Sequence, residues 1–248
     1  MSLFSIITKI TELKSKKPPT CTAVIAAAGI SQRCKGEDKL YYRINDKPVL
    51  AFALEAFQNS ELINDIIIVA CEERYEDISK ICSKFGFDKV SKVIKGGTTR
   101  LESVLNGIYA ASDKTRLIAI HDGARPCIDI DLLERTVIAA AKYNAAAPAV
   151  AITSTVKRAS DETISETVDR EGLFEIQTPQ IFRAELIKAA LTNAMKKSID
   201  ITDDCMAVEI IGAQVHIVEG SRKNIKITDN EDFVLVDAIL GEKDKSCE

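Results

Sequence analysis

The chain has 248 residues, of which 46% are hydrophobic, 28% charged and 5% aromatic, and its formal net charge at pH 7 is -4. This length and composition suit one large α/β domain, or one domain with an extension, and argue against a disordered chain. The negative charge, the few aromatic residues and the lack of tryptophan argue against a broad nucleic-acid-binding surface, so any basic site must be local.

Residues 1–19 are predicted to form a short amphipathic extension. Apolar residues recur there at helical spacing, at Leu3, Ile6, Ile7, Ile10 and Leu13. Lys9 and Glu12 interrupt this run, which excludes a signal peptide, and the segment is too short to span a bilayer. We expect a helix that packs on the domain or is poorly ordered. A partner or membrane-surface helix is the alternative, and no stable membrane association is expected.

Residues 20–242 are predicted to form one domain in which short apolar strands alternate with amphipathic helices. The expected strands cover residues 22–28, 65–70, 90–95, 117–121 and 147–152, and the expected helices cover residues 48–58, 75–84, 100–111 and 130–143. The strand at 117–121 is almost continuously apolar, as expected where helices cover both faces of a sheet. The alternation therefore predicts an α/β fold with a mostly parallel sheet.

The first strand runs into Gly29, and two cations, Arg33 and Lys39, follow it. Ligands of open α/β sheets bind at the carboxyl ends of the strands. Small residues there let a polyanion approach backbone N–H groups, and Arg and Lys neutralise its charge. The glycine patterns of a dinucleotide fingerprint and of a P-loop are both missing. We predict a phosphorylated ligand; the alternative is a turn in which Gly29 supplies a positive φ and both cations are solvated.

Two further segments follow expected strands. Gly96 and Gly97 expose backbone groups, and Ser103 stands in the next helix, so this segment either contacts a base or ribose or is a turn with a helix cap. In His121-Asp-Gly-Ala-Arg-Pro126, Asp122 and Arg125 are costly at the end of a central strand unless they are paired or bound, which favours a functional role. Asp122 could ligate Mg²⁺. His121 is expected to be a structural hydrogen-bonding residue rather than a base.

A β-hairpin arm is predicted at about residues 153–170, because polar and β-branched residues alternate at 155–158 and 163–168. An isolated two-stranded ribbon is marginally stable in water, so we expect another subunit to hold it and the protein to be a homodimer. Arg170, at the base of the arm, can bind a phosphate through two hydrogen bonds. Pairing with Asp169 or Glu171 is the ordinary alternative.

The C-terminal part is predicted to contain helices at 183–196, 203–211 and 230–240 and a strand at 214–219. Lys226 lies in a further apolar segment, 224–228, that has the pattern of an inward-facing strand, and a lysine there needs an anion. Asp203 and Asp204, which follow Thr202, are expected to open the next helix because its dipole favours negative charge.

The order and spacing of these motifs resemble the 2-C-methyl-D-erythritol 4-phosphate cytidylyltransferase family over about residues 21–240. The motifs are Ala-Ala-Ala-Gly29 with Arg33 and Lys39, Gly96-Gly97 with Ser103, His-Asp-Gly-Ala-Arg-Pro126, Thr-Val-Asp-Arg170, Gln-Thr-Pro-Gln180, Thr-Asp-Asp204 and Asn-Ile-Lys226. The resemblance implies a Rossmann-like nucleotidyltransferase with a mostly parallel twisted sheet covered by helices and a protruding β-arm. It also implies a homodimer that makes a CDP-alcohol from CTP in the non-mevalonate isoprenoid pathway.

The resemblance further assigns roles to individual residues. Arg33 and Lys39 contact the triphosphate and stabilise the transition state, while Arg170 and Lys226 position the acceptor phosphate. Asp122 lies near the metal, Mg²⁺, and near the acceptor. The other CTP contacts are Ala27, Ala28, Gly29, Gly97, Thr98 and Ser103, and the other substrate contacts are Arg125, Thr155 and Thr202. In this family the arm enters the neighbouring subunit's site, so Thr155 and Arg170 would act in trans.

The chain departs from the family pattern at four positions. Ser31 stands where a second glycine is usual, Asp38 where a proline is common, Ser154 where an acid is frequent, and Thr98 where an acid often follows the two glycines. The first two changes affect the shape and charge of the loop between Arg33 and Lys39, and the last affects the expected ribose contact.

The expected reaction is attack by the acceptor's ionised phosphate oxygen on the α-phosphorus of CTP, which requires no general base. Transfer to ribitol 5-phosphate is the nearest alternative, and Thr-Val-Asp-Arg170 favours methylerythritol phosphate. A nicotinamide-dependent oxidoreductase would need the missing glycines. A non-catalytic nucleotide-binding module predicts CTP binding without release of pyrophosphate.

The seven cysteines form an odd set without a C-x-x-C pair, which is typical of a reduced intracellular protein rather than a disulfide framework. We therefore expect a cytoplasmic protein.

Overall fold

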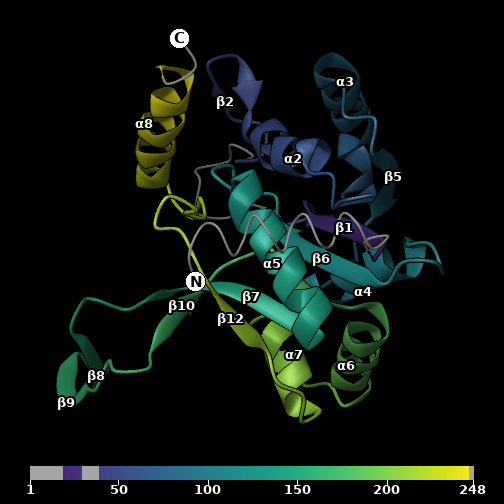
Figure 1. Cartoon of the computed structure of the whole chain (residues 1–248). Coiled ribbons are helices and arrows are strands. Elements are labelled where there is room, and N and C mark those ends of the chain that lie inside the picture. Colours follow the sequence, from purple (N-terminus) through teal and green to yellow (C-terminus); the bar gives the residue numbers. More distant parts are fainter. Residues whose placement is uncertain (1–18, 30–38, 246–248) are drawn as a thin grey trace.

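A twisted central sheet of eight strands forms the middle layer of the protein (Figure 1). This computed structural model describes residues 19–29 and 39–245, with side chains as far as residue 241, so most of the predicted extension and Arg33 lie outside the described residues. The strands are β1 (Cys21–Ala26), β4 (Asp65–Ala70), β5 (Val90–Lys95), β6 (Leu117–Asp122), β7 (Ala145–Ala151), β10 (Phe174–Ile176), β11 (Gln180–Arg183) and β12 (His216–Glu219).

The strand order is β10-β7-β11-β6-β1-β4-β5, with β12 also paired to β7. Strand β1 lies between β4 and β6 and is parallel to both, and β4–β5 and β12–β7 are also parallel pairs. Strands β10 and β11 are antiparallel to their neighbours. The predicted mostly parallel sheet is therefore confirmed, although these two short strands were not predicted from the sequence.

Helices cover both faces of this sheet (Figure 1). Val24 and Ile25 are adjacent in β1 and fully buried, yet they enter different hydrophobic clusters, because successive side chains of a strand point to opposite faces. The helices packed against the cluster of Ile25 are α2 (Val49–Asn59), α3 (Tyr75–Phe85) and α5 (Ile130–Tyr143). Those packed against the cluster of Val24 are α4 (Arg100–Ala110), α6 (Ala184–Lys196) and α7 (Asp204–Ile210).

A third hydrophobic cluster joins the C-terminal helix α8 (Glu231–Lys245) to a small hairpin, β2 (Arg43–Ile44) and β3 (Lys47–Pro48). Phe233 and Val236 of the helix pack there with Ile44 and with Ile227. Residues 224–228 form no strand, contrary to the sequence-based expectation. Their apolar residues are buried by this cluster instead of by a neighbouring strand.

The predicted arm is present as β8 (Val156–Ser160) and β9 (Thr163–Val168). Within the described part of the chain the two strands pair only with each other, and they protrude from the body (Figure 1). Asp161 and Glu162 both have positive φ, as the two central residues of a tight hairpin turn require. Almost every residue of the arm is exposed, including Ile164 at 63%.

No helix among the described residues has the length and apolar character needed to cross a membrane.

Candidate active site

Several of the predicted site residues meet at the carboxyl edge of the parallel strands. Ala26, at the end of β1, pairs in register with Asp122, at the end of β6. The next residues of both strands remain attached to this edge, since the Ala27 N–H donates to Val69 and the Gly123 N–H to Ala26. The loop after β5 also reaches the same place, because a Cβ at Gly96 would lie 2.5 Å from the Cβ of Ala28. Glycine is therefore required at position 96.

Hydrogen bonds within the segment from Gly97 to Ser103 hold its local structure. The Gly97 N–H donates to the Ser103 hydroxyl at 3.0 Å, and that hydroxyl donates to the Thr99 carbonyl at 2.9 Å. Thr99 caps α4. Both the N–H and the hydroxyl of Thr98 donate to Glu102, each at 2.6 Å, a partner that the sequence analysis missed. The turn with a helix cap is thus present, and it lies beside Ala28 at the predicted nucleotide end of the site.

Asp122 is the centre of a charge cluster. Its oxygens lie 2.8 Å from Lys226 Nζ, 3.5 Å from an Arg100 nitrogen and 3.8 Å from Arg125 Nε. Burial alone would raise the pKa of Asp122, but the nearby positive charges, led by Lys226, outweigh it and hold the pKa well below its ordinary value. Asp122 therefore stays ionised and fixes three cations at the strand end.

Arg100 extends this cluster to a second carboxylate, since it also lies 2.8 Å from Asp204. Asp204 is fully buried, and burial raises its pKa although Arg100 opposes the shift. Gln180 holds the same helix start by accepting hydrogen bonds from the N–H groups of Asp204 and Cys205 and donating to Asp203. Asp203 caps α7, so its predicted structural role is confirmed. Thr202 is exposed and contacts Met206 rather than the cluster.

His121 has the structural role that the sequence analysis favoured. It is fully buried, with one ring nitrogen 3.0 Å from the Thr178 hydroxyl and the other 3.2 Å from the Arg125 carbonyl. The Arg125 carbonyl can only accept, so Nε2 carries the hydrogen of the neutral ring. Nδ1 then accepts from the Thr178 hydroxyl, which itself accepts the Asp122 N–H. Burial lowers the pKa of His121 to about 4, so the ring is neutral at physiological pH.

Lys39 and Lys226 lie at the same place although they are far apart in the sequence. Lys39 Nζ donates to the carbonyl of Ile227, the residue after Lys226, at 2.9 Å. The segment that carries Lys226 is fixed by buried hydrogen bonds, from Arg125 to the Asn224 carbonyl at 2.7 Å and from the Asn224 amide to the Thr178 carbonyl at 2.9 Å. Arg125 and Asn224 therefore help to hold Lys226 in position.

A cavity of about 390 Å³ opens beside the cluster. Three cations line it, namely Arg125, Lys226 and Arg222, together with Glu175 and Asp232. Arg222 was not predicted as a site residue; the only sequence signal for it is a pair of basic residues just before Asn-Ile-Lys226. Its Nη2 lies 3.4 Å from the Ala151 carbonyl and 3.4 Å from the Thr153 hydroxyl, at the point where the arm leaves the body.

The arm residues are not brought into this cavity within one chain. Arg170 is exposed and donates to the Thr153 carbonyl, and Thr155 is exposed as well. Neither residue lines the cavity. A single chain thus unites Lys39, Asp122, Arg125 and Lys226 and leaves Thr155 and Arg170 at the surface.

No group of three or more histidine, cysteine, aspartate or glutamate side chains suited to a metal ion occurs in the described part of the chain. Asp122 is the carboxylate that pairs with Lys226 at the strand end. A Mg²⁺ ion here would need most of its ligands from phosphate oxygens and water, which is its usual mode in phosphate chemistry.

Comparison with known proteins gives one consistent result. Residues 21–242 match the family model described as 2-C-methyl-D-erythritol 4-phosphate cytidylyltransferase. The curated protein of that name from Clostridium acetobutylicum is 40% identical over 221 residues, which cover 88% of this chain and 96% of that protein. The one from Caldanaerobacter subterraneus subsp. tengcongensis is 41% identical over 222 residues, 88% of this chain and 98% of that protein.

Solved structures agree with the sequence matches. The crystal structure of 4-diphosphocytidyl-2C-methyl-D-erythritol synthase from Anaerococcus prevotii has a TM-score of 0.80 and 30% identity, covering 90% of this chain and 99% of that one. The 2-C-methyl-D-erythritol 4-phosphate cytidylyltransferase from Thermus thermophilus has a TM-score of 0.74 and 28% identity, with coverage of 88% and 97%. These likenesses confirm the predicted Rossmann-like α/β fold.

Proposed function

This chain belongs to the 2-C-methyl-D-erythritol 4-phosphate cytidylyltransferase family and transfers CMP from CTP to that acceptor, and we propose that it does so between Lys39, Asp122 and Lys226. The products are 4-diphosphocytidyl-2-C-methyl-D-erythritol and pyrophosphate. The observation that supports this site is the joining of Lys39 to the backbone beside Lys226, with Lys226 held 2.8 Å from Asp122. Two cations from distant segments thereby meet where two phosphates have to approach each other.

In the reaction, an ionised oxygen of the acceptor phosphate attacks the α-phosphorus of CTP in line. A new oxygen–phosphorus bond forms, and the bond from the α-phosphorus to the bridging oxygen breaks, so that pyrophosphate leaves. The nucleophile needs no base, and buried His121 has both ring nitrogens engaged and takes no part in proton transfer. Catalysis comes from positioning two anions against their repulsion and from stabilising charge on the transferring phosphate.

The two substrates occupy neighbouring parts of the strand edge. CTP lies over Ala27, Ala28 and Gly29 and beside Gly97, with Lys39 and Arg33 on its triphosphate; Thr98 and Ser103 lie at the same end. The acceptor occupies the cavity of Arg125 and Lys226. Asp122 joins these two regions, because its backbone pairs with Ala26 of β1 and its carboxylate pairs with Lys226.

Asp122 is also the proposed protein ligand of Mg²⁺. When bound, the ion offsets phosphate charge and favours the departure of pyrophosphate. Asp122 is paired with Lys226, so it would have to leave this ion pair to ligate Mg²⁺. An arriving phosphate would allow this, because it would give Lys226 a new anionic partner.

We also infer that the enzyme is a cytoplasmic homodimer held through the arm. Among the described residues the arm forms no strand pairing with the body, and a two-stranded ribbon is marginally stable alone. A partner would cover exposed Ile164 and place Thr155 and Arg170 near the acceptor phosphate in the neighbouring site. Cys21, Cys82 and Cys205 are free thiols, which agrees with a reducing compartment.

The direct test is release of pyrophosphate from CTP with either 2-C-methyl-D-erythritol 4-phosphate or ribitol 5-phosphate as acceptor. Turnover with the first acceptor and little with the second is expected. Lys39→Ala should lower kcat by roughly 10²-fold by loss of charge stabilisation. Lys188→Ala, which removes an exposed lysine from α6, should leave kcat unchanged. Full turnover by Lys39→Ala would contradict the proposed site.

A further inference from the structure

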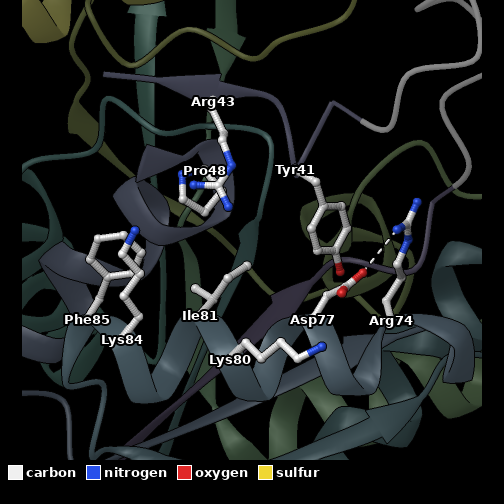
Figure 2. Close-up of a pocket in the computed structure, with 9 residues that line it drawn as sticks. All are labelled: Tyr41, Arg43, Pro48, Arg74, Asp77, Lys80, Ile81, Lys84 and Phe85. Carbon is white, nitrogen blue, oxygen red and sulfur yellow. Dashed lines mark hydrogen bonds and ion pairs between the residues drawn. The ribbon is translucent and has the colours of Figure 1, made fainter. Parts of the chain in front are cut away.

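A second cavity, of about 290 Å³, lies between α3 and the β2–β3 hairpin. None of the described residues lines both this cavity and the cavity of Arg125 and Lys226. Figure 2 shows that Asp77, Lys80 and Lys84 of α3 lie on one side of the cavity and that Arg43 of the hairpin lies on the opposite side. Nothing in the cytidylyl transfer described above uses this cavity.

The walls of the cavity are rich in positive charge. Four cations line it, Arg43, Arg74, Lys80 and Lys84, against a single carboxylate, Asp77. The local charge is therefore +3 in a chain whose net charge is -4. Asp77, Lys80 and Lys84 share one face of α3 because they are spaced three and four residues apart.

Two of the four cations, Arg43 and Lys84, have no acidic partner among the described residues, whereas Arg74 and Lys80 each have one. The Asp77 carboxylate is itself neutralised by Arg74, 3.1 Å away, whose guanidinium lies 4.5 Å from the centre of the Tyr41 ring. Lys84 has the Phe85 ring at 5.2 Å, and Arg43 donates to the Asp46 carbonyl at 2.8 Å. Neither forms an ion pair with a carboxylate of the described residues.

The positions of Lys80 and Lys84 each have an ordinary structural explanation, but these two explanations do not account for all four cations that line the cavity. Lys80 pairs with Glu76 at 3.3 Å, and both side chains are more than two-thirds exposed, so the pair is weak. Lys84 lies in the last turn of α3, where a cation is favoured by the helix dipole. Arg43 comes from a different element and gains nothing from that dipole, yet it faces the same cavity (Figure 2).

The floor of the cavity is apolar. Ile81 is 8% exposed and Pro48 is buried, and the ring of Phe85 lies beside them. A purely inorganic anion has no apolar group that could pack against this apolar floor. Arginine and lysine on two walls, above an apolar floor, suit a multivalent phosphate group that carries a small organic part.

We propose that this cavity is a second binding site, for a small molecule that bears a diphosphate group. Arg43 and Lys84 hold one end of the diphosphate, Arg74 and Lys80 the other, and the organic part lies on Ile81 and Phe85. Such a ligand has two possible sources, pyrophosphate released by the reaction or an organic diphosphate from elsewhere in metabolism. The apolar floor favours the organic diphosphate.

Isothermal titration calorimetry tests the site with two probes, inorganic pyrophosphate and a short alkyl diphosphate. Saturating CTP without acceptor is present throughout, so that the nucleotide site is filled. The wild type should bind the alkyl diphosphate at one site, more tightly than pyrophosphate. Arg43→Gln combined with Lys84→Gln should weaken this binding at least tenfold, because two charge-assisted contacts are lost.

The matched control removes the same charge elsewhere, as Lys196→Gln with Lys197→Gln at the end of α6, and should bind like the wild type. Equal weakening by both pairs would mean non-specific charge attraction and would overturn the proposal, as would absence of binding to the wild type. The affected residues are on the surface, and thermal unfolding checks that each variant is folded. Turnover of the Arg43/Lys84 variant should stay at the wild-type level, so a failed site leaves the cytidylyltransferase assignment intact.

Discussion

The ammonium of Lys226 lies 2.8 Å from a carboxylate oxygen of Asp122, and this ion pair links the C-terminal segment to the edge of the central sheet. Asp122 holds Lys226, Arg100 and Arg125 close together although the three cations repel one another. The carboxylate thereby keeps positive charge in place before any phosphate arrives. In the proposed reaction, an acceptor phosphate would replace Asp122 as the partner of Lys226.

The first prediction concerns Lys226. Replacement by alanine should lower kcat/KM for the acceptor by roughly 10²-fold, because the acceptor phosphate loses a fixed cation in the transition state. Lys223→Ala is the matched control, since Lys223 lies in the same segment, is exposed and does not line the cavity. Steady-state kinetics with acceptor varied at saturating CTP measures the effect. A loss of equal size in both variants would contradict a specific role for Lys226.

The second prediction concerns Arg222, which lines the acceptor cavity and has no ion-pair partner among the described residues. Arg222→Ala should raise the KM for the acceptor about tenfold, the expected effect of losing one charge-assisted contact. The KM for CTP should not change, because Arg222 lies on the acceptor side. Arg222→Lys should recover part of the loss. A change in both KM values would indicate that Arg222 supports the fold of the site instead.

The third prediction tests whether the arm acts in trans. Arg170→Ala and Lys39→Ala should each be nearly inactive alone. In a mixed dimer, one site would combine an intact Lys39 with the partner's intact Arg170. Random exchange of subunits at equal concentrations should therefore restore roughly a quarter of the wild-type activity. Sedimentation or light scattering confirms the dimer, and no recovery after verified exchange would mean that Arg170 serves its own chain.

Much of this site could be predicted because its residues follow strand ends, and strand ends are visible in a sequence as the limits of apolar runs. The 224–228 segment was wrongly predicted as a strand, since burial by α8 and the β2–β3 hairpin produces the same apolar pattern as burial in a sheet. Strands β10 and β11 are three and four residues long, too short to show a period. The Arg100–Asp204 pair joins residues more than a hundred positions apart, and no local pattern marks such a pair.

The fourth prediction concerns pH and the buried His121. Burial lowers its pKa to about 4, whereas the ordinary value is 6.5. Between these two values the unfolded chain binds a proton that the folded protein does not, so the free energy of unfolding should fall as the pH falls from about 6.5 to 4. The stabilisation is fully present above pH 6.5, and His121 contributes no further loss below pH 4. The total loss should be at most about 3 kcal/mol.

Denaturant unfolding at a series of pH values measures this loss, and variants assign it. His121→Gln removes the titrating group, so its unfolding free energy should depend less steeply on pH between 6.5 and 4. His216→Gln, at an exposed histidine, should keep the steep wild-type dependence. The depressed pKa of Asp122 acts in a different window, because its stabilisation is lost only as the pH falls below the ordinary carboxylate value of 3.8. If His121→Gln keeps the wild-type slope above pH 4, the buried neutral imidazole is not the cause.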